Sequence, residues 1–261
     1  MAKSVLVLSG LDPCGGAGIS ADIETLNQFG VTALPIITAL TVQNTHSVKE
    51  VQAVDAELIA KQFTHLQDDI DIQTVKIGLL VSNEQIERIA ELLRKIDERT
   101  SLTVILDPII KSSSEDVLLS SDTVQMLKQV LLPLVTVLTP NSAELSALSA
   151  EKNEQQQVAS LPCEWVLVTT TDISDVQIQH RLYQNGKLIK SYNYKKLSGD
   201  YHGSGCTLAS GIAALLAQGL TPSIACEKAL DYTYQTLLNA KSIGKMQQHP
   251  NRKLLKSYLG G

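Results

Sequence analysis

The sequence predicts an α/β protein with a mostly parallel central sheet and helices on both faces, a three-layer αβα arrangement. Short β-rich runs alternate with longer amphipathic runs along almost the whole chain. Such alternation builds right-handed βαβ units, whose crossover helices cover both faces of the sheet. No repeat, low-complexity segment or interdomain linker interrupts the pattern, so we expect residues 1–261 to form a single domain.

Apolar periodicity and turn signals justify the expected elements of the first half. The run 5–8 is apolar and is soon followed by glycine, as expected for a buried strand. In the segment 55–67, Leu58, Ile59 and Phe63 fall on one face at helical spacing. On similar grounds we expect further strands at 34–40, 75–78 and 102–106, and helices at 19–29, 55–67 and 83–96.

The second half repeats the alternation and adds a hairpin. Asn185-Gly186 separates two β-rich runs within 180–194, a combination typical of a tight hairpin turn. The polar stretch 151–157 is expected to be an exposed loop. The remaining expected elements are strands at 135–138 and 166–168, and helices at 121–131, 142–148, 207–218 and 222–239.

Composition excludes several classes of function. Lys+Arg total 22 against Asp+Glu 27, and no basic cluster suggests a nucleic acid or an anionic membrane as partner. The four cysteines form no CxxC pair, which argues against a zinc or redox motif and favours a reducing compartment. The first apolar run is too short for a signal peptide, and no stretch is long enough to span a bilayer. We therefore expect a soluble, cytoplasmic protein.

The segment 202–211, HGSGCTLASG, is the most informative motif. Glycines around a small polar residue let backbone N–H groups converge, and the start of the following helix adds positive charge. Gly203, Ser204 and Gly205 could therefore bind a transferring phosphate, although a tight turn with a good cap explains the same letters. Cys206 lies where this position favours a thiolate, which could take a proton from an attacking alcohol. The alternative for Cys206 is a small buried side chain.

Two segments of the first half suggest a pocket for a small planar ligand. The segment 9–18, SGLDPCGGAG, lacks the GxGxxG pattern, so we exclude a dinucleotide site of that type. Asp22 is expected in the first turn of the next helix, either as a substrate contact or as an acid favoured by the helix dipole. Gln43 follows a strand, and its amide can donate and accept side by side, which suits an aminopyrimidine. A polar cap of the loop is the alternative for Gln43.

Oxygen ligands follow two strands of the second half. Asn141 and Glu144 stand three residues apart at the start of a helix, and together they could hold Mg²⁺ through water. A capping box explains the same pair equally well. Asp107, which ends its own strand before a proline, is a further candidate ligand.

The chain resembles the hydroxymethylpyrimidine/phosphomethylpyrimidine kinases of thiamine biosynthesis. The resemblance rests on seven short strings that occur in the same order as in that family: SGLDPCGGAGISAD, ITALTVQNT, VKIGLL, DPII, LLP, TPNSAEL and YHGSGCTLASGIAALLA. The resemblance implies a ribokinase-like fold and two ATP-dependent phosphorylations, first of the pyrimidine alcohol and then of its monophosphate. It also implies Mg²⁺ and a homodimer.

The resemblance assigns roles to residues of this chain. It implies an anion hole at Gly203, Ser204 and Gly205 with Cys206 as the catalytic cysteine, and a pyrimidine pocket at Gly10, Asp22 and Gln43. Asn141 and Glu144 match an Asn-x-x-Glu element near Mg-ATP, and we expect Thr139 and Thr169 on the nucleotide side as well. Related kinases that act on pyridoxal have aspartate in place of Cys206, so the cysteine favours the pyrimidine.

One departure from the family concerns the nucleotide. The family usually has Lys-Gly-Gly after the strand 166–168, where this chain has Thr169-Thr170-Thr171 and no lysine. Lys111 is a candidate to supply the missing charge. Two alternatives stay open: a pyridoxal kinase, which Gln43 and Cys206 argue against, and a catalytically weak pyrimidine-binding protein, which the missing lysine favours.

Overall fold

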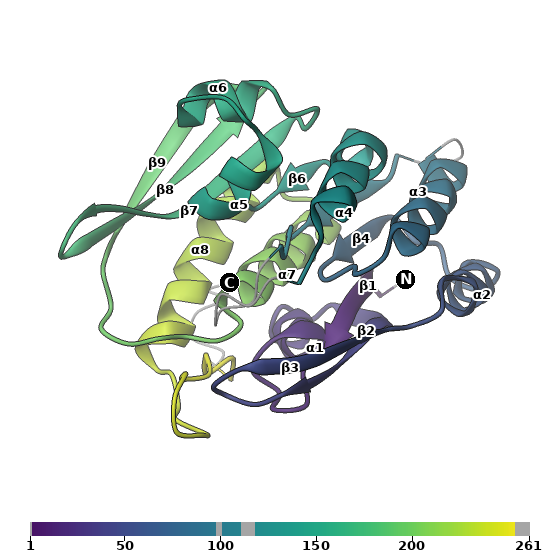
Figure 1. The fold of residues 1–261 in the computed structure, drawn as a ribbon, viewed down its shortest axis with the longest axis horizontal. Coiled ribbons are helices and arrows are strands. Elements are labelled where there is room, and N and C mark those ends of the chain that lie inside the picture. The colour runs from purple at the N-terminus through teal and green to yellow at the C-terminus, as the bar shows by residue number, and fades with distance from the viewer. Residues whose placement is uncertain (1, 98–100, 111–117, 254–261) are drawn as a thin grey trace.

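The computed structural model describes residues 2–97, 101–110 and 118–253. These residues form one nine-stranded sheet in the order β3-β2-β1-β4-β5-β6-β7-β8-β9 (Figure 1). The strands from β2 to β7 in this order run parallel, whereas β3, β8 and β9 pair antiparallel at the two edges. The bounds are β1 Ser4–Leu11, β2 Thr32–Gln43, β3 Val48–Ala53, β4 Thr74–Ile77, β5 Thr103–Leu106, β6 Val137–Leu138, β7 Trp165–Ser174, β8 Gln177–Gln184 and β9 Lys187–Lys195.

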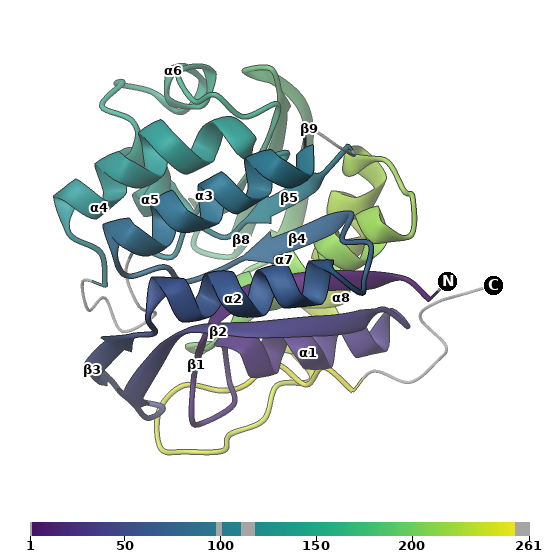
Figure 2. The same cartoon turned by 90° about the vertical axis from the view of Figure 1, so that its right-hand side faces the viewer.

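Helices cover both faces of the sheet, and Figure 2 shows α2 and α3 in front of it with α1 behind. The helices are α1 Gly18–Gln28, α2 Ala56–Gln67, α3 Asn83–Asp97, α4 Ser121–Met126, α5 Ser142–Leu148, α6 Glu154–Ala159, α7 Ser204–Ala217 and α8 Pro222–Leu238. Alternate side chains of β1 pack into two apolar cores on opposite faces of the sheet. Leu6 packs on the side of α2 and α3, and Val7 packs on the side of α1, α7 and α8. The predicted three-layer αβα arrangement is therefore confirmed.

Polar caps fix several helix starts. Asp55 accepts a hydrogen bond from the Leu58 N–H at 2.8 Å and begins α2, while Ser120 does the same for α4 through Thr123. The predicted hairpin between β8 and β9 is confirmed. Asn185 and Gly186 both have positive φ, at 48° and 74°, which is the backbone that a tight hairpin turn requires.

Several predicted elements are wrong in detail. The stretch 151–157 is not simply a loop, because Asn153 caps α6 through the N–H of Gln156. The strand β3 was not predicted because its exposed residues at the sheet edge include charges and give no apolar run. The helix expected over 121–131 is α-helical only to Met126, then π-helical, and a 3₁₀ turn containing Pro133 ends it.

Within the described ranges, we find no helix with both the length and the apolar character needed to cross a membrane.

Candidate active site

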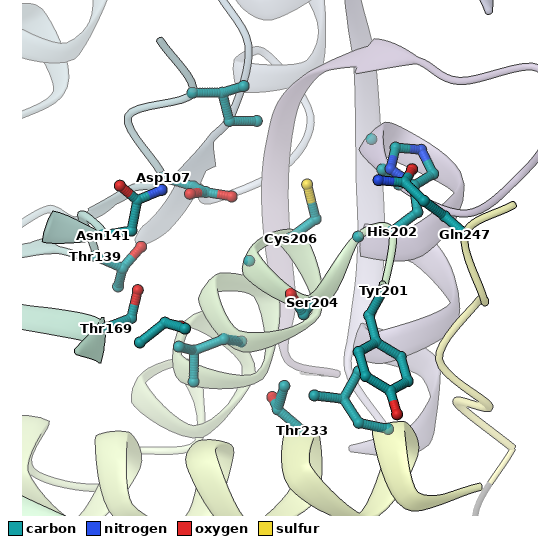
Figure 3. A pocket seen from close by; sticks show the side chains of 18 of the residues that line it. Asp107, Thr139, Asn141, Thr169, Tyr201, His202, Ser204, Cys206, Thr233 and Gln247 are labelled. Carbon is teal, nitrogen blue, oxygen red and sulfur yellow. The ribbon is translucent and has the colours of Figure 1, made fainter. Parts of the chain in front are cut away.

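A cavity of about 570 Å³ opens at the carboxyl ends of the parallel strands. This edge of an open α/β sheet is where ligands usually bind. The start of α7 faces the same cavity. Figure 3 shows one group of side chains at neighbouring strand ends and another beside the loop before α7, with Cys206 between them. The predicted site residues that line the cavity are Gly10, Gln43, Asp107, Thr139, Asn141, Glu144, Thr169, Gly203, Ser204, Gly205 and Cys206.

The turn before α7 depends on glycine. Gly203 is the residue before the helix and has a φ of 88°, in the left-handed region that side chains other than hydrogen rarely adopt. A Cβ at this position would collide with the carbonyl oxygen of Gly16. The predicted phosphate-binding segment is therefore held against the glycine-rich loop that follows β1, and its backbone faces the cavity.

Cys206 is buried at the start of α7, where its thiol points toward the cavity (Figure 3). Burial raises the pKa of the Cys206 thiol to about 12, although the ammonium of Lys76 acts in the opposite direction. The prediction that this helix start favours a thiolate is therefore wrong, because loss of hydration outweighs the field of the helix. Asp107 lines the same cavity as Cys206, and burial raises the pKa of Asp107 to about 6.

Asp22 lies beneath the cavity and is absent from its wall. It sits in the second turn of α1 rather than the first, is 0% exposed, and forms an ion pair with Lys76 at 2.9 Å. Ser210 of α7 donates a further hydrogen bond to Asp22 at 2.7 Å. The structure thus gives Asp22 a partner that neither sequence interpretation foresaw, a lysine on the neighbouring strand β4.

Gln43, at the end of β2, faces the cavity beside His202 and Asp12. The Gln43 amide lies 2.9 Å from His202 Nε2, and the same Nε2 lies 2.9 Å from a carboxylate oxygen of Asp12. Hydrogen bonds from His202, Cys14 and Ala17 outweigh the effect of burial and hold the pKa of Asp12 well below its usual range. These contacts fasten the glycine-rich loop, the end of β2 and the start of α7 to one another.

The three predicted metal ligands gather on one side of the cavity. Asn141 and Glu144 form a complete capping box for α5, with both hydrogen bonds at 2.9 Å, so the structural alternative is present. Burial and the nearby Asp107 nevertheless raise the pKa of Glu144 to about 8. Two carboxyl groups that disfavour each other's charge are a suitable setting for a hard divalent cation with oxygen ligands. The residues therefore fit Mg²⁺.

The nucleotide side shows how the chain departs from Lys-Gly-Gly. Thr170 stands in place of the first glycine of that pattern and has a left-handed backbone, with a φ of 53°. Its N–H donates to His180 Nδ1 at 3.1 Å. Lys111 lies outside the described residues. Among the lining residues that the structure describes, Lys196 is the one lysine or arginine.

Three residues of the site were not identified from the sequence. Lys76 interrupts an apolar strand, which was the signal available for it. Asp12 and His202 stand inside the two glycine-rich motifs, but their pairing across 190 positions leaves no local pattern.

Solved structures define the class. A Bacillus subtilis pyridoxal kinase in complex with ADP superposes with a TM-score of 0.86 at 23% identity, covering 98% of this chain and all of its own. A phosphomethylpyrimidine kinase from Clostridium difficile superposes with a TM-score of 0.76 at 28% identity, covering 90% of this chain and 99% of its own. The fold is that of the ribokinase-like small-molecule kinases.

Sequence comparison places the chain within that class. The family described as phosphomethylpyrimidine kinase matches residues 12–251. A hydroxymethylpyrimidine/phosphomethylpyrimidine kinase from Rhizobium meliloti is 33% identical over 246 residues, which cover 91% of each chain. The Salmonella typhimurium protein of the same name is 34% identical over 221 residues, covering 81% of this chain and 82% of its own. The chain belongs to the phosphomethylpyrimidine kinase family, as its motifs predicted.

Proposed function

We propose that this kinase phosphorylates the hydroxymethyl group of 4-amino-5-hydroxymethyl-2-methylpyrimidine and then the resulting monophosphate, with ATP as donor. One observation carries the proposal: Cys206 and the glycine-rich start of α7 face the same cavity as Gln43, so a thiol, backbone N–H groups and an amide converge on one space. Family membership supplies the reaction class.

The cavity suggests how the two substrates divide it. The pyrimidine would lie by Gly10 and Gln43, at the ends of β1 and β2, with the nucleotide by Thr139, Asn141 and Thr169 at the ends of β6 and β7. The start of α7 lines the same cavity as both groups, and there its N–H groups would stabilise charge on the phosphoryl group during in-line transfer.

Proton removal is assigned to Cys206 in the first phosphorylation. The thiol is neutral when buried, so it must lose a proton as the substrate hydroxyl gives one up. Asp107, which shares the cavity wall with the thiol and has a pKa raised to about 6, would receive that proton, and Lys76 favours the transient thiolate. A substrate phosphate needs no such base, so the second phosphorylation depends chiefly on charge stabilisation.

Asn141 and Glu144 would hold Mg²⁺, which would neutralise the phosphates of ATP, whereas Asp107 is assigned to the proton of Cys206 rather than to the metal. The cavity wall includes four carboxylates, those of Asp12, Asp107, Glu144 and Asp200, and among its described residues a single lysine. Because one lysine cannot balance the charge of the ATP phosphates beside these carboxylates, a bound cation agrees with this wall. A homodimer and a cytoplasmic location complete the proposal. The four free cysteines favour a reducing compartment.

One experiment tests the function against both alternatives. The protein is incubated with Mg-ATP and either the hydroxymethylpyrimidine or pyridoxal, and products are measured by mass spectrometry. We expect mono- and diphosphorylated pyrimidine, with much slower phosphorylation of pyridoxal. Preference for pyridoxal would favour a pyridoxal kinase, and binding of the pyrimidine without turnover would favour a binding protein.

A further inference from the structure

The carboxylate of Asp12 is surrounded by donors. One oxygen accepts hydrogen bonds from the Cys14 N–H at 3.0 Å and the Cys14 thiol at 2.8 Å. The other accepts from the N–H groups of Gly16 and Ala17, at 2.8 and 2.9 Å, and lies 2.9 Å from His202 Nε2. An ionised carboxylate can only accept hydrogen bonds. His202 Nε2 therefore carries a hydrogen, whether the ring is neutral or protonated.

This hydrogen decides which end of the Gln43 amide can face His202. With Gln43 Nε2 at 2.9 Å from His202 Nε2, two donors face each other. With Gln43 Oε1 in that place, the imidazole N–H donates to both Asp12 and Gln43. A half-turn of the amide exchanges the two ends at nearly constant shape, so the chemistry of the neighbours selects the orientation.

Thr41 gives the same answer independently, from the other end of the amide. Its hydroxyl donates to the backbone carbonyl of Leu11 at 3.0 Å, and the end of Gln43 that faces it is 3.2 Å away. A hydroxyl has one hydrogen and two lone pairs. With the single hydrogen on Leu11, Thr41 can only accept from Gln43. Gln43 Nε2 therefore belongs on the Thr41 side, and one half-turn satisfies both contacts.

We infer that His202 and Thr41 lock the Gln43 amide with Oε1 toward His202 and Nε2 toward Thr41, and that this lock selects an aminopyrimidine over an oxopyrimidine. The inference rests on the proposed function, in which Gln43 contacts the pyrimidine. The locked amide keeps one lone pair on Oε1 and one N–H for a ligand. An amino group beside a ring nitrogen matches this pair, whereas an oxo group beside a ring N–H presents the reverse pattern.

An amide that is free to turn could serve either pattern, so the selectivity lies in the two neighbours and not in Gln43 alone. Sites built for a particular hydrogen-bond pattern discriminate strongly, because the wrong ligand leaves buried polar groups unpaired. We expect the wild-type protein to prefer the 4-amino substrate to its 4-oxo analogue by about 100-fold or more in kcat/KM.

The main test compares this ratio in variants. Thr41→Val keeps the shape of the side chain and removes the hydroxyl, and His202→Phe removes the imidazole donor. Each should lower the amino-to-oxo ratio by about tenfold, the loss expected for one hydrogen bond of about 1.4 kcal/mol. Thr41→Ser should restore the ratio. A role in folding alone would lower kcat/KM for both pyrimidines equally and leave the ratio unchanged, which would overturn the inference.

A second measurement does not depend on turnover. Neutron diffraction from the deuterated protein distinguishes an ND₂ group from a carbonyl oxygen. We expect deuterium on the end of Gln43 that faces Thr41; deuterium on the end that faces His202 would refute the lock. Failure of the wild-type protein to phosphorylate the 4-amino substrate would instead refute the proposed function, so the two failures are distinguishable.

Discussion

Lys76→Met tests whether the ion pair beneath the cavity stabilises the fold. Lys76 and Asp22 are both 0% exposed, and Lys76 Nζ lies 2.9 and 3.0 Å from the two Asp22 oxygens. Methionine keeps most of the length of lysine but has no charge. The substitution therefore leaves packing nearly intact and leaves the Asp22 carboxylate buried with a hydrogen bond from Ser210 but without its lysine.

The expected cost follows from desolvation of the remaining charge. Removing one partner of a buried ion pair costs about 3–5 kcal/mol. In chains of this size about 1 kcal/mol shifts the thermal midpoint by roughly 2–4 °C, so Lys76→Met should lower Tm by about 6–20 °C. Urea unfolding, followed by circular dichroism and by the fluorescence of Trp165, measures the free energy directly.

The matched control is the double variant Lys76→Met/Asp22→Asn, which removes both charges. Because Asp22 then carries no charge that needs a partner, the stability should return to within about 1–2 kcal/mol of the wild-type value. A loss below about 1 kcal/mol in the single variant, or a double variant no more stable than the single one, would show that the pair does not stabilise the fold.

Three further predictions concern the cavity. Cys206→Ala should slow the first phosphorylation by about 10²–10⁴-fold and the second much less, because only the first needs a base. Single-turnover assays would measure the rates of both phosphorylations. Equal losses in the two rates would contradict the role of Cys206 as a base. Glu144 has a pKa raised from 4.5 to about 8, so the folded state holds a proton that the unfolded chain releases, and stability should fall as pH rises from about 4.5 to 8. Glu144→Gln should remove that slope and raise the free energy of unfolding at pH 8 by up to about 4 kcal/mol, because each pKa unit is worth about 1.4 kcal/mol, and an unchanged pH profile would refute this. Thr170→Gly should stabilise the protein by up to about 1 kcal/mol in urea unfolding, because glycine adopts the φ of 53° without strain; a loss of stability would contradict strain at this position.

Local chemistry explains why most elements were predictable from the sequence. Asp55 and Ser120 cap helices through residues three positions away, and Asn185-Gly186 makes a turn with its own backbone. Such signals lie within a few residues and need no knowledge of the rest of the fold. The edge strand β3 shows the limit, since its residues pair with β2 and bury little.

The site divides in the same way. The motifs identified part of the cavity lining, such as Asp107, Asn141 and Cys206, because strand ends and a glycine-rich helix start are features of the chain itself. The protonation of Cys206, the partner of Asp22 and the orientation of Gln43 were not predictable. They depend on Lys76, Asp107 and His202, which lie far away in sequence.

The sequence by itself therefore determined the alternation of elements, the family and the set of side chains at the strand ends, since each follows from neighbouring residues. Only the tertiary structure decided which of those groups carry charge and which way their donors point. The physical reason is that desolvation and pairing act over a few ångströms in space, and Asp12 and His202 meet at 2.9 Å although 190 positions separate them in the chain.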